Sequence, residues 1–145
     1  MSPKSQKARS HKKPMPARRR TTTLRAADIV AFVATTHPAR AKAFYRDRLG
    51  LVLRSEDQFA LVFDANGTML RVTTVREVAA AQYTVLGWHV ADVAAAVDKL
   101  ERVGVMFERY AGLKQDECGI WTAPSGARIA WFKDPDGNTL SLTQF

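Results

Sequence analysis

The sequence has only one cysteine, Cys118, among 145 residues. A disulfide within the chain is therefore excluded, and a reducing compartment is the simpler expectation. Long apolar runs are also missing: the longest, IVAFVA, is far below the 20 or so residues that span a bilayer. The N-terminal region lacks the apolar core of a secretory signal, so we expect a cytoplasmic protein. Gly-rich phosphate loops, paired CxxC motifs and Ser-His-Asp spacing are absent, so the chemistries that they signal are not indicated.

Acidic residues are missing from residues 1–27, which hold nine Lys or Arg. The rest of the chain has 13 basic and 14 acidic residues, so the net charge of +8 comes from this N-terminal tail. This segment is too polar and too like-charged to offset its ordering entropy, and we predict that it is disordered. Three interpretations stay open: a solvated extension, a weak polyanion-binding arm, or an organelle transit peptide.

The first half of the remaining chain alternates between strand and helix patterns. DIVAFVAT, residues 28–35, is typical of a half-buried strand. A helix is predicted over 38–49, because Pro38 suits a first helical position and Gly50 a helix end. Strands are predicted over 51–55, 59–64 and 68–75, the last two joined by the turn sequence ANG.

The second half repeats this order. Its expected elements are a strand over 83–90, a helix over 93–103 between Asp92 and Gly104, and strands over 105–110, 119–123, 127–132 and 139–145. A loop is expected over roughly 110–118. Val30 and Val85 are 55 residues apart, as two copies of one unit would require. The predicted fold is therefore α+β, with two βαβββ modules (28–77 and 82–145) paired around a concave cleft, where ligands usually bind.

Three stretches resemble the vicinal oxygen chelate superfamily, which includes glyoxalase I, bleomycin-resistance proteins and extradiol dioxygenases. They are HPARAKAFYRDRLGLVL, LGWHVADVAAAVDKLERVGV and WFKDPDGNTLSLTQF. The resemblance covers residues 28–145. It implies the same paired-module fold and a homodimer, since family members pair modules within a chain or swap them between chains.

In metal-using members, the resemblance implies four strand positions that hold His, Gln or Glu ligands. In this sequence these positions fall on Val30, Arg71, Val85 and Ser141, none of which is a usual ligand. A neutral hydroxyl alone cannot hold a catalytic divalent ion. A guanidinium about 4 Å from such an ion would cost roughly 8 kcal/mol at an effective dielectric of 20. We therefore predict no metal site, no cofactor and no catalytic residue at these positions.

Other side chains offer weaker chemistry. His89 lies an even number of residues after Val85, so strand alternation places both on one face, where the imidazole could contact a ligand or move a proton. His37 and His11 are too few and too scattered to complete a relocated metal site. Cys118 is flanked by acids, which disfavour the thiolate that a nucleophile needs.

The cleft residues favour binding over catalysis. Arg71 could anchor a carboxylate, phosphate or sulfonate, or it could pair with an acid such as Glu77 or Asp116. Aromatic side chains suit flat or apolar ligands, although strand aromatics also fill cores. The predicted ligand-binding residues are Val30, Phe32, Arg71, Val85, His89, Trp121 and Ser141.

The sequence therefore predicts a metal-free protein that sequesters or carries an apolar or aromatic small molecule with an anionic group. The alternative is a lyase, isomerase or dioxygenase-like enzyme. Such an enzyme would use His89 as a metal-independent acid or base, or would hold a metal at a relocated site.

Overall fold

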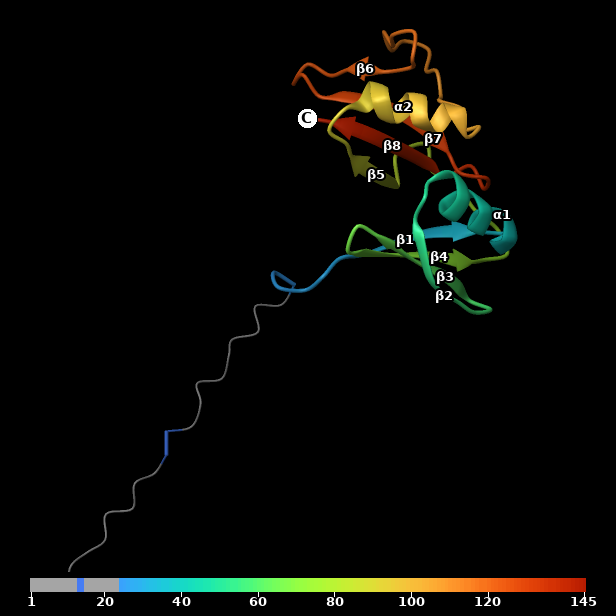
Figure 1. Cartoon of the computed structure of the whole chain (residues 1–145), viewed down its shortest axis with the longest axis vertical. Coiled ribbons are helices and arrows are strands. Elements are labelled where there is room, and N and C mark those ends of the chain that lie inside the picture. Colours follow the sequence, from blue (N-terminus) through green and yellow to red (C-terminus); the bar gives the residue numbers. More distant parts are fainter. Residues whose placement is uncertain (1–12, 15–23) are drawn as a thin grey trace, which may run out of the picture.

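The computed structural model describes residues 13–14 and 24–145, and the second range forms two four-stranded sheets (Figure 1). Most of the predicted disordered tail, 1–27, lies outside the described residues. The first sheet has the order β1-β4-β3-β2, with β1 Val30–Thr35, β2 Val52–Glu56, β3 Ala60–Ala65 and β4 Thr68–Thr74. The second has the order β5-β8-β7-β6, with β5 Leu86–His89, β6 Trp121–Thr122, β7 Arg128–Lys133 and β8 Thr139–Gln144. Each sheet comes from one half of the chain, and the predicted α+β fold is confirmed.

Local signals place the helices well. Pro38 begins α1 (Pro38–Lys42), and Asp92 caps α2 (Val93–Arg102) by accepting a hydrogen bond from the Ala95 amide at 3.0 Å. Gly50 and Gly104 both have positive φ, which glycine adopts without strain where a helix ends. In the described part of the chain, no helix is both long and apolar enough to cross a membrane.

The first helix changes type halfway, which the sequence pattern does not predict. After Lys42 the chain continues as a π-helix, η1 (Ala43–Arg48), and the Leu49 amide donates to the Phe44 carbonyl five residues earlier. Two consecutive aromatic residues are buried here. Phe44 packs toward Phe132 of the second sheet, and Tyr45 packs toward Phe63 of the first. The π-helix thus accompanies the burial of neighbouring side chains against different sheets.

The strand predicted over 105–110 is wrong, apart from a single bridge between Phe107 and Phe132. The Gln115 side chain forms hydrogen bonds with backbone groups that a neighbouring strand would otherwise bind. Its amide nitrogen donates to the Glu108 carbonyl at 3.0 Å, and its oxygen accepts from the Tyr110 amide at 2.7 Å. A side chain from the following loop therefore replaces the strand ladder.

One continuous core joins the inner faces of both sheets. The first sheet contributes Phe63 and Val72, and the second contributes Phe132 and Leu140, all with almost no exposed surface. Figure 1 shows the first sheet below the second, with α1 between their levels at one side. Because both inner faces share this core, the opposite faces of the two sheets are turned away from it.

Candidate ligand-binding site

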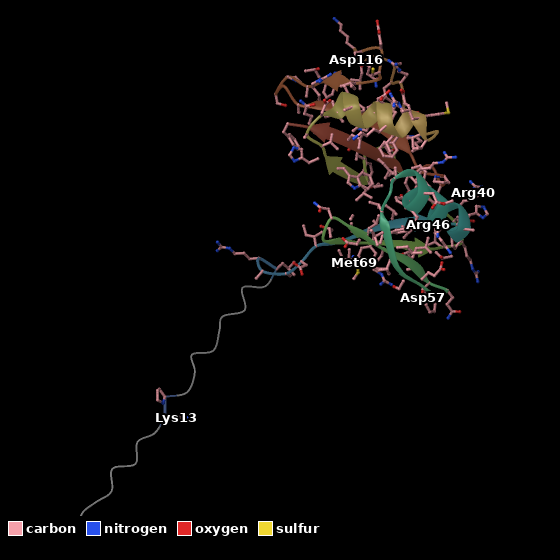
Figure 2. The ribbon with its side chains drawn as sticks, viewed as in Figure 1. Lys13, Arg40, Arg46, Asp57, Met69 and Asp116 are labelled. Atoms are coloured by element: carbon pink, nitrogen blue, oxygen red, sulfur yellow. The ribbon has the colours of Figure 1, made fainter. Side chains whose placement is uncertain are left out.

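Each sheet has an open face opposite its core face, defined by strand alternation. The first open face carries Val30, Phe32, Met69 and Arg71. The second open face carries Val85, Trp121, Trp131 and Ser141. Figure 2 labels Met69 on the first sheet. The positions predicted from the resemblance to hold metal ligands in relatives thus lie on open faces, as a binding surface requires.

The first open face combines an arginine with exposed apolar side chains. Arg71 of β4 lies between Phe32 of β1 and Val62 of β3 in the strand register. Phe32 is 60% exposed, and Val30 and Met69 are about two-fifths exposed. Such exposure is unusual for large apolar residues that lie side by side on one sheet.

The two modules place their candidate positions with the same offset. Val30 pairs with Met69, two residues before Arg71. The Val85 amide donates to the Thr139 carbonyl at 2.9 Å, and Thr139 lies two residues before Ser141. The two pairs of positions that the family resemblance implies are thus equivalent in the two modules.

The second open face is partly filled by Trp131. This tryptophan pairs with Ser141 across β7 and β8, and its indole nitrogen donates to the Thr84 hydroxyl at 3.1 Å. Thr84 precedes β5, so the indole reaches across β8 toward the sheet edge. Ser141 is only 6% exposed, and its hydroxyl lies 2.6 Å from where a Cβ would stand on Gly87. Ser141 is therefore enclosed by its neighbours and has little surface to offer a ligand.

Trp121 and His89 lie at different parts of the second sheet. The Trp121 ring is 6.1 Å from that of Trp131, which in turn lies 5.5 Å from Tyr110, so these residues form an aromatic cluster. His89 is on the edge strand β5, exposed, with its ring 5.2 Å from the Phe145 ring. An aromatic wall and a solvent-accessible imidazole are both available on this sheet.

The seven predicted binding residues are divided between the two sheets. Val30, Phe32 and Arg71 lie on the first sheet; Val85, His89, Trp121 and Ser141 lie on the second. His89 borders a cavity of about 270 Å³ that Leu100 and Leu142 also border. The sequence pattern assigns the faces but not their separation, because that depends on how the two modules pack.

Arg71 has no carboxylate partner among the described residues. It takes part in none of their ion pairs, and Asp116 lies instead 3.8 Å from Arg128. The Arg71 charge does act on the Asp57 carboxylate. Backbone amides of Phe59 and Ala60 lower the pKa of Asp57, and Arg71 adds to this effect. The alternative of a pair with Glu77 or Asp116 is not observed.

The residues present do not fit the metal site that the family resemblance implies. The four positions supply two valines, one guanidinium and one enclosed hydroxyl. They offer a divalent cation no carboxylate or imidazole ligand. Among the described residues, no three His, Cys, Asp or Glu side chains gather as metal ligands.

A polar network that the sequence analysis did not identify fixes the second sheet to the first. The Asp136 carboxylate accepts from the Thr35 hydroxyl at 2.5 Å and from the Thr36 amide and hydroxyl at 2.8 Å each. Burial disfavours the charged form of Asp136, but these bonds outweigh it and lower its pKa. The Asn138 amide donates to the Ala34 carbonyl at 2.9 Å. The DPDGN turn thereby holds the start of β8 against the end of β1; its sequence signal indicated only a turn.

Comparisons with known proteins agree with this geometry. The family model of the Glyoxalase/Bleomycin resistance protein/Dioxygenase superfamily matches residues 26–142. No curated protein matches the sequence. One similar solved structure is lactoylglutathione lyase from Agrobacterium tumefaciens, with 18% identity and a TM-score of 0.64, covering 82% of this chain and 93% of that chain.

Another is the bleomycin resistance determinant encoded on transposon Tn5, with 19% identity and a TM-score of 0.64, covering 81% and 96%. A third is a member of the same superfamily from Sphaerobacter thermophilus DSM 20745, with 20% identity and a TM-score of 0.62, covering 81% and 97%. Likeness at these identities shows the fold alone. Because the family model spans most of the sequence, the chain belongs to the Glyoxalase/Bleomycin resistance protein/Dioxygenase superfamily.

Proposed function

We propose that this protein is a metal-free small-molecule-binding protein. It sequesters or carries an apolar or aromatic ligand that has an anionic group. The observation that carries the proposal is Arg71, which lies beside exposed Phe32 and has no ion-pair partner among the described residues. The family resemblance implies that this is a ligand position in relatives.

The chemistry of the first open face suits such a ligand. A guanidinium binds carboxylate, phosphate or sulfonate groups in a bidentate manner. Phe32, Val30 and Met69 surround it with apolar surface that a flat ring could cover. Anion and ring would therefore be bound by adjacent parts of one face.

A homodimer would complete the cleft. Within one chain the two open faces are turned away from the shared core, and both leave large apolar side chains exposed. In a two-fold dimer, the first open face of each chain would meet the second open face of its partner, forming two equivalent clefts. The Trp121 and Trp131 cluster would then supply the second wall of each cleft.

Replacing Arg71 by alanine is expected to weaken an anionic ligand by about tenfold or more, because a charge-assisted hydrogen bond contributes roughly 1.5–3 kcal/mol. A thermal-shift screen over metabolites and antibiotics would supply the ligand, since a compound that binds the folded state raises its stability. Titration calorimetry then compares an anionic hit with its neutral amide. Equal weakening of the two would refute the anchor role of Arg71.

The matched control is Arg54→Ala, which removes another arginine of the first sheet, one that pairs with Asp64 at 2.9 Å. It should leave the affinity nearly unchanged.

Mixing Arg71→Ala with Trp131→Ala chains tests the dimeric cleft. Random reassortment restores about a quarter of the clefts when the walls come from different chains. A cleft within one chain would show no recovery.

A further inference from the structure

A cavity of about 510 Å³ lies at the junction of the two modules, away from both open faces. It is bordered by α1 and η1 of the first module, by the segment after α2, and by the DPDGN turn. Figure 2 labels Arg40 at this junction, between the levels of the two sheets. The volume is within the range of cavities that hold small molecules.

Three cationic side chains border this cavity: Arg40 from α1, Arg48 from η1 and Lys133 from the end of β7. Neutral carbonyls position two of them. Arg40 donates to the Pro135 carbonyl at 3.2 Å, and Arg48 donates to the Gly104 carbonyl at 3.3 Å. None of the three takes part in the ion pairs of the described residues. Most of their N–H donors therefore remain available to an anion.

Two carboxylates also border the cavity, but one is already engaged. Asp134 is buried, and its oxygens accept from the Tyr45 hydroxyl, the Asn138 side-chain amide and two backbone amides. Glu108 is the remaining acid. The cations thus outnumber the acids, and the geometry leaves only Glu108 to compete for them directly.

The other side of the cavity is apolar. Phe44 and Val105 are buried in the core beneath it, and Met106 is 83% exposed at its border. The methionine side chain is flexible and polarizable, so it can pack against organic groups of different shapes. Cationic and apolar borders together favour an amphiphilic ligand.

The π-helix contributes to this arrangement. In an α-helix, residues four apart drift by about 40° around the axis. Across the change from α1 to η1, Arg40, Phe44 and Arg48 all border the same cavity. π-Helical turns cost stability and are frequent at functional sites.

We propose that this cavity binds an organic phosphate monoester. The phosphate lies among Arg40, Arg48 and Lys133, and the organic group lies against Val105 and Met106. This site is separate from the open faces and does not depend on the function proposed for them.

Phenyl phosphate and inorganic phosphate are suitable probes. Their binding to the full chain is followed by the chemical shifts of backbone amides in NMR titrations. We expect saturable shifts around Gly104 and Met106, with phenyl phosphate binding more tightly than phosphate. Arg48→Gln should weaken both by about tenfold, because it removes charge-assisted hydrogen bonds. Lys133→Gln, an exposed substitution outside the core, gives a second variant if Arg48→Gln is unstable.

Two charge-matched controls are available. Arg102→Gln removes a cation that pairs with Asp98 on α2, and Arg54→Gln removes a cation that pairs with Asp64 on the first sheet. Both should bind phenyl phosphate as the wild type does. Absence of saturable shifts, or equal affinity in the wild type and in both cavity variants, would overturn the proposal.

Discussion

Replacing Phe132 by alanine is expected to lower the free energy of unfolding by about 4 kcal/mol, the typical loss for a buried aromatic side chain. Phe132 is fully buried, and its ring lies 6.4 Å from Phe44, 6.3 Å from Trp88 and 5.5 Å from Phe107. Phe44 belongs to the first module and the other two to the second. The lost ring therefore leaves a cavity where the modules share their core.

Urea unfolding followed by tryptophan fluorescence measures this loss. Phe59→Ala is the matched control, because Phe59 is 64% exposed and should change the free energy of unfolding by less than about 1 kcal/mol. A Phe132→Ala variant as stable as Phe59→Ala would contradict the shared core.

Replacing Asp134 by alanine is expected to destabilise the protein by about 3–4 kcal/mol, because buried donors lose their acceptor. The carboxylate accepts from the Tyr45 hydroxyl at 2.7 Å and from the Asn138 side-chain amide at 2.8 Å. Burial, and then the Asp134 charge, raise the pKa of Tyr45, so its hydroxyl remains a donor. Tyr45 belongs to the first module and Asp134 to the second, so the bond joins the two.

A double-mutant cycle with Tyr45→Phe isolates the coupling. Tyr45→Phe alone should cost about 1–2 kcal/mol, since the other donors of Asp134 remain. The double variant should be clearly more stable than the sum of the single losses predicts, because the hydroxyl left without an acceptor is then gone. Strictly additive losses in urea unfolding would argue against a direct bond.

Local sequence signals predicted the helix boundaries because short-range physics decides them. Asp92 supplies its oxygen to an amide three residues later, and Gly50 and Gly104 need only their own positive φ. Alternation likewise assigned Val85 and His89 to one face of the second sheet, because adjacent side chains of a strand point to opposite faces.

The features that the sequence did not reveal depend on distant contacts. The strand predicted over 105–110 is displaced by the side chain of Gln115, and the π-helix accompanies packing against both sheets. The relative placement of the modules rests on contacts such as the bond from Thr35 to Asp136, 101 residues apart. A pattern of propensity and spacing carries no information about such pairs.

The candidate site shows the same division. Register placed Ser141 correctly on the second open face, but Trp131 encloses it and Gly87 leaves room for its hydroxyl. Sequence alternation identifies the face of a residue, not the neighbour that covers it. In the strand register Ser141 lies between Trp131, a large residue, and Gly87, which has no side chain. This combination is the sequence signal that could have indicated the enclosure.

Elemental analysis of the protein purified without chelators tests the metal-free site most directly. With two valines, a guanidinium and an enclosed hydroxyl at the four family positions, the bound zinc, nickel, manganese and iron should together stay far below one ion per chain. Near-stoichiometric content of any of these metals would contradict the proposed binding function.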